Sequence, residues 1–225
     1  EDFLNQFPFT NFQNESILLK GARLFEFEQI SKALQQKSHQ TILEINLDAM
    51  ISNLNYYRLK VKPETKMMIM VKAFSYGSGS YEVANIMQYF HVDYLAVAYA
   101  DEGVELRKSG INLPIMVMSP DEQSFDSMLK YDLEPEIYNF KILAKLEEAI
   151  KKNILPKNKP VKIHIKIDTG MHRLGIRPEE YQEYVDRLHA CKNVAKPLRY
   201  MSHLGCADEL DNPTTKKQLE TFMSL

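Results

Sequence analysis

Six short apolar segments, separated by stretches with helical periodicity, constrain the fold of this chain more than any other feature. The segments are KMMIMVKA (66–73), VDYLAVAY (92–99), LPIMVM (113–118), LEPEIY (133–138), VKIHIKID (161–168) and LRYMSH (198–203). Amphipathic stretches lie between most of them, among them residues 80–90, 100–110 and 141–153. Near-continuous apolar strands that alternate with helices are typical of a parallel sheet whose faces are covered. The sequence therefore predicts six β/α units.

The number of units favours an incomplete barrel. A (β/α)8 TIM-type barrel has eight such units and about 250 residues. Six units leave two strand edges unpaired, which is costly in a stable protein. We therefore expect a (β/α)8 barrel truncated to about six β/α units, and the spacing leaves a complete open α/β sheet as the alternative. No GxGxxG motif follows the first strand, which argues against a dinucleotide-binding fold.

The segment before these units has a different character. Residues 17–19 are predicted to form a strand, Gly21 a turn, and the residues up to 34 an amphipathic helix, which is too little to bury a core. Residues 35–40 are polar and have the composition of a linker. We place the boundary near Gln40, so that an extension spans 1–40 and the barrel spans 41–225.

The barrel portion opens with an alternating pattern. Residues 41–45, TILEI, read as a half-buried strand. Asp48 is expected to cap the helix that follows, which carries Met50, Leu54 and Tyr57.

Composition excludes several classes of protein. Apolar residues make up 44% of the chain and charged residues 26%, which is enough apolar material for a core and rules out disorder. The formal charge of −2 argues against a dedicated nucleic-acid binder. The two cysteines show no metal-ligand spacing and are too few for a disulfide scaffold. No apolar run approaches the roughly 20 residues of a membrane span, and the first residues do not resemble a signal peptide. We expect a soluble cytoplasmic protein with neither nucleic acid nor membrane as a partner.

Lys72 is the first candidate for chemistry. It ends the most apolar of the predicted strands, and the carboxyl ends of barrel strands face the active site. Partial burial lowers the pKa of a lysine and makes its amine available to an aldehyde. For a lone lysine, a strand-end side chain that reaches solvent is the more common situation.

The turn YGSG follows, from Tyr76 through Ser78 to Gly79. Free N–H groups at a helix start, next to a hydroxyl, suit a phosphate, although ordinary β-to-α turns also use glycine. An amine that captures an aldehyde and a phosphate seat are what pyridoxal 5'-phosphate (PLP) needs.

Two further clusters follow strands. In KIDTGMHRLG, Arg173 is a permanent cation for a phenolate or carboxylate, and Lys166 and Asp168 share a strand parity that can direct both inward. A salt-bridged rim is the alternative. In YMSHLGCADE, His203 ends the sixth strand and can stack on a ring or carry protons, while Cys206 is interpreted as a packing residue.

These motifs resemble a known family. MVKAFSYGSGSYEVA, VDYLAVAYADEGVELRKSGI, KIDTGMHRLGI and SHLGCADE are similar, in order and spacing, to alanine racemases of the PLP-dependent fold type III, over about residues 41–225. The DTGMxRLG element distinguishes racemases from the barrel decarboxylases. The resemblance implies a PLP-dependent isomerase that interconverts L- and D-alanine for peptidoglycan precursor synthesis.

The resemblance also implies a role for each site residue. Lys72 matches the lysine that binds the cofactor covalently and acts as base on one face of the substrate. Tyr76 matches a phosphate-binding tyrosine, Arg173 the arginine on the phenolic oxygen, and His203 the histidine against the pyridine ring. Lys166 stands where many members carry a carbamylated lysine that steadies this arginine.

Two departures from the family pattern stand out. Ser78 occupies a position where the family commonly has histidine, so no role follows for its side chain. The family's second catalytic base, a tyrosine contributed across a homodimer, belongs to a C-terminal β-domain that would follow residue 225. Residues 41–47 join that domain's sheet in the family and so lack partners here. We therefore expect weak or no activity from these 225 residues alone.

The extension has a resemblance of its own. SILLKGARLFEFEQISKAL is similar to the closing segment of UDP-N-acetylmuramoyl-tripeptide–D-alanyl-D-alanine ligases, which implies a bifunctional ligase/racemase. The ligase's nucleotide-binding elements are not in the sequence, so no ligase activity is expected from it. The alternatives left open are another fold-type III enzyme such as an amino-acid decarboxylase, a PLP-binding protein without turnover, and a purely structural fragment.

Overall fold

The computed structural model describes residues 15–20, 27–34, 43–153, 160–191, 193–194, 199–209 and 211–225. The chain divides into two compact units, Glu1–Ile45 and Asn46–Leu225. The predicted boundary near Gln40 and the predicted linker 35–40 lie outside the described residues. Within the described part of the chain, no helix has both the length and the apolar character that a membrane span requires.

The first unit contains one described helix, α2 (Glu28–Leu34), within the region where the sequence predicts a helix. The predicted strand at residues 17–19 is wrong, because residues 15–20 have no regular structure. The side chains of Ile17 and Leu18 are exposed, and no strand in the described residues pairs with them. A short apolar run without a partner strand cannot satisfy its backbone hydrogen bonds in a sheet. The predicted turn at Gly21 lies outside the described residues.

The second unit contains all six predicted strands. They are β1 (Met68–Met70), β2 (Tyr94–Val97), β3 (Ile115–Val117), β4 (Glu134–Ile137), β5 (His164–Lys166) and β6 (Arg199–Met201). The helical elements are α3 (Leu47–Arg58), α4 (Lys72–Tyr76), α5 (Ser80–Tyr89), α6 (Ala100–Lys108), α7 (Phe125–Lys130), α8 (Phe140–Lys152), η3 (Pro178–Glu180), α9 (Tyr181–Ala190) and α10 (Pro213–Met223). Each strand lies within its predicted apolar segment.

Two details at the start of this unit differ from the prediction. Residues 43–46 form no strand, so the strand predicted at 41–45 is wrong in its described part, where no neighbouring strand pairs with it. The helix α3 is capped by Asn46 rather than Asp48, because the Asn46 side chain accepts a hydrogen bond from the N–H of Ala49 at 2.9 Å. Asp48 lies in the first turn, where its negative charge favours the helix dipole.

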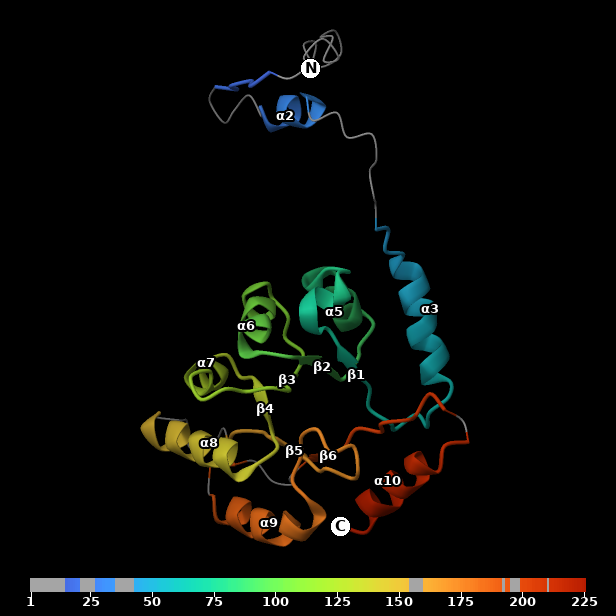
Figure 1. Ribbon diagram of the computed structural model, residues 1–225, viewed down its shortest axis with the longest axis vertical. Coiled ribbons are helices and arrows are strands. Elements are labelled where there is room, and N and C mark those ends of the chain that lie inside the picture. Colours follow the sequence, from blue (N-terminus) through green and yellow to red (C-terminus); the bar gives the residue numbers. More distant parts are fainter. Residues whose placement is uncertain are drawn as a thin grey trace. The chain divides into compact units, whose positions relative to one another are not determined.

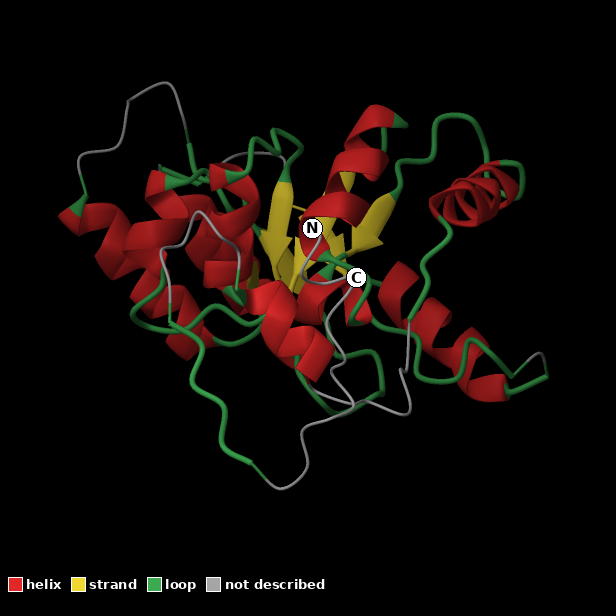
Figure 2. Cartoon of the chain, turned by 90° about the horizontal axis from the view of Figure 1, so that it is seen from above, coloured by secondary structure: helices red, strands yellow, loops and turns green. Residues whose placement is uncertain are grey.

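The strands form one sheet in the order β1-β2-β3-β4-β5-β6, and every pair is parallel. Sequential order without a reversal is the arrangement of a barrel, whereas a doubly wound open sheet reverses its order at a switch point. Helices α5 to α9 follow one another around the curved sheet (Figure 1), and the strands lie among them when seen from above (Figure 2). The second unit is therefore an α/β half-barrel, as the predicted truncation requires.

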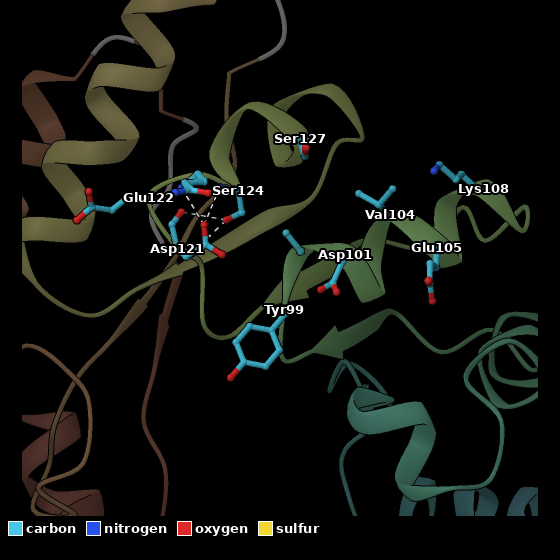
Figure 3. A pocket seen from close by; sticks show the side chains of 11 residues that line it. Tyr99, Asp101, Val104, Glu105, Lys108, Asp121, Glu122, Ser124 and Ser127 are labelled. Carbon is cyan, nitrogen blue, oxygen red and sulfur yellow. Dashed lines mark hydrogen bonds between the residues drawn. The ribbon is translucent and has the colours of Figure 1, made fainter.

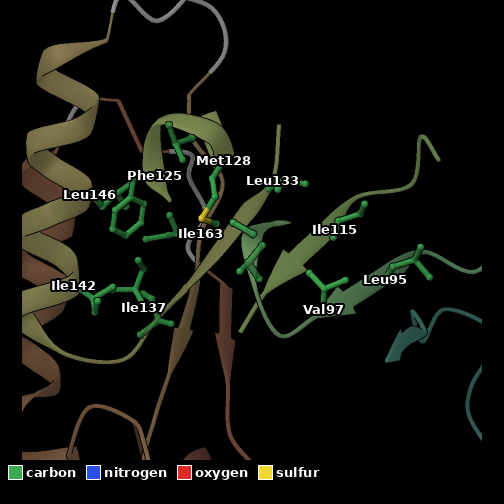
Figure 4. Packing of buried hydrophobic residues seen from close by; sticks show 14 of the residues in the cluster. Leu95, Val97, Ile115, Phe125, Met128, Leu133, Ile137, Ile142, Leu146 and Ile163 are labelled. Carbon is green, nitrogen blue, oxygen red and sulfur yellow. The ribbon is translucent and has the colours of Figure 1, made fainter. Parts of the chain in front are cut away.

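The outer face of the sheet carries the hydrophobic core. Leu95, Ile115, Ile137 and Ile165 are fully buried there and belong to one cluster with apolar side chains of the helices. Figure 4 shows Ile137 of β4 beside Ile142 of α8 and near Phe125 of α7, with Val97 beside Ile115 further along the sheet. Burial of this apolar surface is the main force that holds helices to the sheet.

The inner face has a different composition. Because side chains alternate along a strand, the residues between the outer-face positions point the other way. The cross-strand register places Met116 beside Glu134, Glu136 beside His164, and His164 beside Arg199. Glu134, Glu136, His164 and Lys166 are buried, so this face of the sheet contains a ladder of charged groups.

Candidate functional site

Lys72 begins an unusual backbone segment directly after β1. Ala73, Phe74, Ser75 and Tyr76 all have φ between 51° and 57°, so four consecutive non-glycine residues form one turn of left-handed helix. The N–H of Ser75 closes the turn on the carbonyl of Val71 at 3.3 Å. Left-handed backbone costs about 1–2 kcal/mol per L-residue. Such strain persists where the surrounding structure enforces it and often accompanies function.

Glu102 holds this strained turn in place. Its carboxylate accepts the N–H of Ala73 at 2.7 Å through Oε1, and those of Ala98 at 2.7 Å and Tyr99 at 3.1 Å through Oε2. A single side chain on α6 thereby joins the loop after β1 to the loop after β2. Hydrogen bonds to a charged acceptor are stronger than neutral ones, so Glu102 fixes the backbone that carries Lys72.

The turn after the strained segment leads into helix α5. Tyr76 is exposed and, with Ser78, lines a cavity of about 370 Å³. The Oγ atom of Ser75 is buried at the same cavity and has no hydrogen-bond partner among the described residues. The first N–H groups of the ten-residue helix α5 lie directly after this turn, where an anion is favoured.

A second turn follows β5 and carries Arg173. The turn is closed at its base, because Ile167 pairs with Ile176 and the N–H of Asp168 donates to the carbonyl of Ile176 at 2.9 Å. A Cβ at Gly175 would lie 2.4 Å from the backbone nitrogen of Asp168, and φ at this glycine is +138°. Only glycine therefore fits this base, which presents Arg173 on a constrained loop.

The carboxylate of Asp168 serves the loop itself. It accepts the N–H groups of Gly170 and His172, each at 3.0 Å, and pairs with the His172 ring at 3.3 Å. Burial raises the pKa of Asp168, but these hydrogen bonds and the His172 charge outweigh it, so the pKa lies below its usual value. Asp168 is a structural organiser of the turn.

Lys166 points into the inner face of the sheet and is buried. Its Nζ lies 3.1 Å from Oε1 of Glu136, and the two side chains are only 4% and 1% exposed. Desolvation raises the pKa of Glu136 above its usual value, while the charges of Lys166, His164 and Arg173 oppose that rise. The lysine thus lies in a buried ion pair, beneath the loop that carries Arg173.

His203 follows β6, and the pKa of its imidazole depends on the three predicted cations. Burial lowers the pKa of its imidazole, and the positive charges of Arg173, Lys166 and Lys72 lower it further. Lys72, Arg173 and His203 follow β1, β5 and β6, so all three lie at the carboxyl end of the parallel sheet. The positive charges at this end of the sheet favour the neutral form of the His203 imidazole.

A buried glutamine connects two of these loops. Gln218 of α10 is 1% exposed, and its Nε2 donates to the carbonyl of His203 at 2.9 Å and to Oγ1 of Thr169 at 3.2 Å. Its Oε1 accepts the N–H of Gly205 at 2.9 Å. The amide therefore sets the loop of His203 against the loop of Arg173.

Comparison with known proteins bears on this geometry. The model of the family "Alanine racemase, N-terminal domain" matches residues 45–225, four-fifths of the chain. The chain belongs to the alanine racemase family.

Individual relatives agree with this assignment. The alanine racemase of Aliivibrio salmonicida is 45% identical over 185 residues, which cover 81% of this chain and 49% of that protein. The alanine racemase of Vibrio cholerae is 42% identical over 185 residues, with 80% and 48% covered. The chain thus spans about half the length of the curated relatives it matches.

Solved structures of alanine racemases resemble the fold. A Clostridium difficile 630 enzyme in complex with cycloserine superposes with a TM-score of 0.74 at 32% identity, covering 84% of this chain and 51% of that one. The biosynthetic alanine racemase of Pseudomonas aeruginosa gives a TM-score of 0.69 at 29% identity, covering 80% and 48%. The half-barrel thus has the fold of alanine racemase structures.

Sequence reasoning missed three polar residues that support this racemase-family site: Glu102, Glu136 and Gln218. Glu136 had a readable signal, because it alternates with apolar residues in its strand just as Lys166 does in the next strand. The alternation of side chains between the two faces of the sheet could have predicted that Glu136 and Lys166 form a pair. Glu102 also accepts from Ala73, 29 residues away, and Gln218 bonds residues 13 to 49 positions away, so no local pattern indicates these partners.

A separate groove of about 850 Å³ lies between α6 and the turn before α7. Figure 3 shows Asp101 and Glu105 on α6 across from the turn, where the Asp121 side chain accepts the N–H groups of Gln123 and Ser124, both at 2.8 Å. The lining of this groove includes none of the predicted site residues. This groove is therefore distinct from the cationic site.

Proposed function

We propose that the cationic site binds pyridoxal 5'-phosphate and that the protein racemises alanine. The observation that carries the proposal is the position of Lys72, Arg173 and His203, which all follow strands of one parallel sheet at its carboxyl end. The charges of Arg173, Lys166 and Lys72 each lower the pKa of His203, which supports their grouping. PLP carries an aldehyde, a phenolic oxygen and a phosphate, and this site offers an amine, a guanidinium and a helix start to match them. The chemistry of the residues fits the cofactor.

Each residue has a proposed task. Lys72 would hold the aldehyde carbon through Nζ, from a backbone turn fixed by Glu102. Arg173 would donate to the phenolic oxygen, and the His203 ring would lie against the pyridine. Tyr76 and the first N–H groups of α5 would hold the phosphate. When bound, PLP supplies the electron sink that makes the α-proton of an amino acid acidic.

We propose that Lys72 transfers the α-proton of the substrate on one face. With the cofactor bound, the Lys72 amine would accept or return the α-proton on one face of the substrate. We propose that a second residue serves the opposite face, which the family resemblance assigns to a tyrosine outside these 225 residues, contributed within a homodimer. The role that follows is the supply of D-alanine to peptidoglycan precursors in the cytoplasm.

PLP titration tests the binding part of this proposal. The chain should develop the visible absorbance of lysine-bound PLP, and Lys72→Ala should abolish it. Lys66→Ala is the matched control, since Lys66 precedes the same strand but is exposed. Equal absorbance in wild type and Lys72→Ala would reject the assignment of Lys72.

Activity is tested on the longer protein that contains these residues. Alanine should lose optical rotation without release of CO₂, which separates a racemase from a decarboxylase. Lys72→Ala should remove this activity. CO₂ release from an amino acid, with optical rotation of alanine unchanged, would favour a decarboxylase instead.

We also propose that residues 1–40 are the end of a ligase domain, so that the parent protein is bifunctional. The separation of Glu1–Ile45 as its own compact unit supports this proposal, as does the start of the family match at residue 45. The test is to sequence the coding frame upstream and assay the longer product for ATP-dependent ligation of D-alanyl-D-alanine. An upstream frame without nucleotide-binding elements would contradict it.

A further inference from the structure

Strand β4 carries two carboxylates into the inner face of the sheet. Glu134 is satisfied there by three partners: His164 at 2.8 Å, Arg199 at 2.7 Å and Lys162 at 3.5 Å. Glu136, two residues further toward the carboxyl end, has one side-chain partner among the described residues, Lys166. The two glutamates share a strand, a face and a charge, but only Glu134 has its bonding capacity filled.

One of the two carboxylate oxygens of Glu136 lacks a hydrogen-bond donor among the described residues. Oε1 accepts from Lys166, whereas Oε2 is buried and accepts no hydrogen bond from any described residue. A buried carboxylate oxygen without a donor is unfavourable, and native proteins rarely keep one without a reason. The orientation of Glu136 therefore leaves one acceptor position open beneath the site.

Arg173 is a donor available to this acceptor. It is exposed, and no hydrogen bond or ion pair engages its guanidinium within the described residues. It follows Lys166, the partner of Glu136, by seven residues, in a loop whose base is closed by the pairing of Ile167 with Ile176. In agreement with this placement, the charge of Arg173 lowers the pKa of both Glu136 and His203.

We propose that Glu136 is a positioning residue for Arg173. Oε1 neutralises Lys166, and Oε2 accepts an N–H of the guanidinium, which reaches it by side-chain rotation. The carboxylate thereby holds the cation over the site, where it faces His203. That this cation then serves the phenolic oxygen of PLP rests on the proposed function.

The first measurement needs no cofactor. The pKa of His203 is followed by NMR in the 225-residue chain, with its signal assigned by loss in His203→Gln. Arg173→Gln should raise this pKa, because it removes a positive neighbour from the imidazole. In the Glu136→Gln background the same change should raise it less, because Arg173 is no longer held near His203.

The second measurement uses PLP itself as the probe. Glu136→Gln and Arg173→Gln should each weaken PLP binding about tenfold, the effect of losing one charge-assisted hydrogen bond. The double variant should be no weaker than the weaker single variant, since both remove the same contact. In contrast, Glu136→Gln and Lys166→Met should weaken PLP binding additively, because Glu136 acts on PLP through Arg173 and not through Lys166.

Glu134→Gln is the matched control, with the same loss of charge from the same strand and face. It should bind PLP within about twofold of wild type. Glu136→Asp, which keeps the charge, should recover part of the affinity. Thermal unfolding of each variant separates a loss of binding from a loss of folded protein.

The outcomes distinguish the two proposals. If Glu136→Gln matches Glu134→Gln in both measurements, the positioning role of Glu136 is overturned. The role is also overturned if Glu136→Gln further weakens PLP binding in the Arg173→Gln background but not in the Lys166→Met background. If wild type does not bind PLP while the coupling between Arg173 and His203 depends on Glu136, the positioning stands and the proposed function fails.

Discussion

The two faces of the same six strands differ sharply in what they bury. On the outer face, Leu95, Ile115 and Ile165 pack against helices in one apolar cluster. On the inner face, Glu136 and Lys166 are equally buried but form an ion pair. Two adjacent residues of β5 thus differ in how they are buried: Ile165 lies among apolar side chains, and Lys166 lies in an ion pair.

The comparison shows which face stabilises the fold and which face is available for chemistry. Apolar burial is favourable without further conditions. A buried ion pair gains little over an apolar pair of similar size, because desolvation offsets the attraction. The inner charges therefore do not follow from a need for stability. We propose that function explains them instead.

The sharpest way to break this comparison is to remove one member of the inner pair. Lys166→Met leaves the Glu136 carboxylate buried without a partner and should lower the free energy of unfolding by about 3–5 kcal/mol. The double variant Glu136→Leu/Lys166→Met should recover most of that loss, yet bind PLP weakly. Urea unfolding and PLP titration measure the two properties. A double variant as unstable as the single one would show that the pair itself holds the fold.

A smaller effect is expected at the loop that presents Arg173. Gly175→Ala forces a Cβ to within 2.4 Å of the Asp168 nitrogen at φ +138°, so the loop must shift. We expect a loss of about 1–3 kcal/mol in the free energy of unfolding, together with weaker PLP binding. Gly110→Ala is the control: its φ is +93°, but nothing lies within 4 Å of the added Cβ. It should cost about 1 kcal/mol and leave PLP affinity unchanged. Unchanged PLP binding in Gly175→Ala would argue that the loop does not set the site.

The smallest expected change sharpens the contrast within β5. Ile165→Val removes one methylene from the outer face and should cost about 0.5–1.5 kcal/mol in the free energy of unfolding. PLP affinity should stay at the wild-type value, because Ile165 faces the helices rather than the site. Impaired PLP binding by the Ile165→Val variant at full stability would contradict the separation of the two faces.

The sequence predicts the outer face better than the inner one. Apolar segments such as residues 92–99 and 113–118 contain their own evidence for strands, because each must be buried on both sides. The strands expected at 17–19 and 41–45 fail because a strand also needs a partner, which a local pattern does not reveal. The cap of α3 is wrong by two residues for a similar reason, since Asn46 and Asp48 both have suitable side chains.

The site is predicted only where it depends on position along a strand. Lys72, Lys166 and His203 are candidates because each lies at or near the carboxyl end of a strand, and their roles stay predictions. The partners Glu136 and Gln218 are missed, since register and tertiary packing determine them. The left-handed turn after Lys72 cannot be predicted either, because none of the four residues 73–76 favours that backbone.

The central claim is that the amine of Lys72 captures a pyridoxal aldehyde at the carboxyl end of this sheet. The most direct measurement is to add PLP, reduce the complex with borohydride, and map the modified lysine by mass spectrometry of its peptides. The account predicts a single pyridoxyl adduct on Lys72. An adduct on Lys166, on surface lysines alone, or on no residue would contradict it.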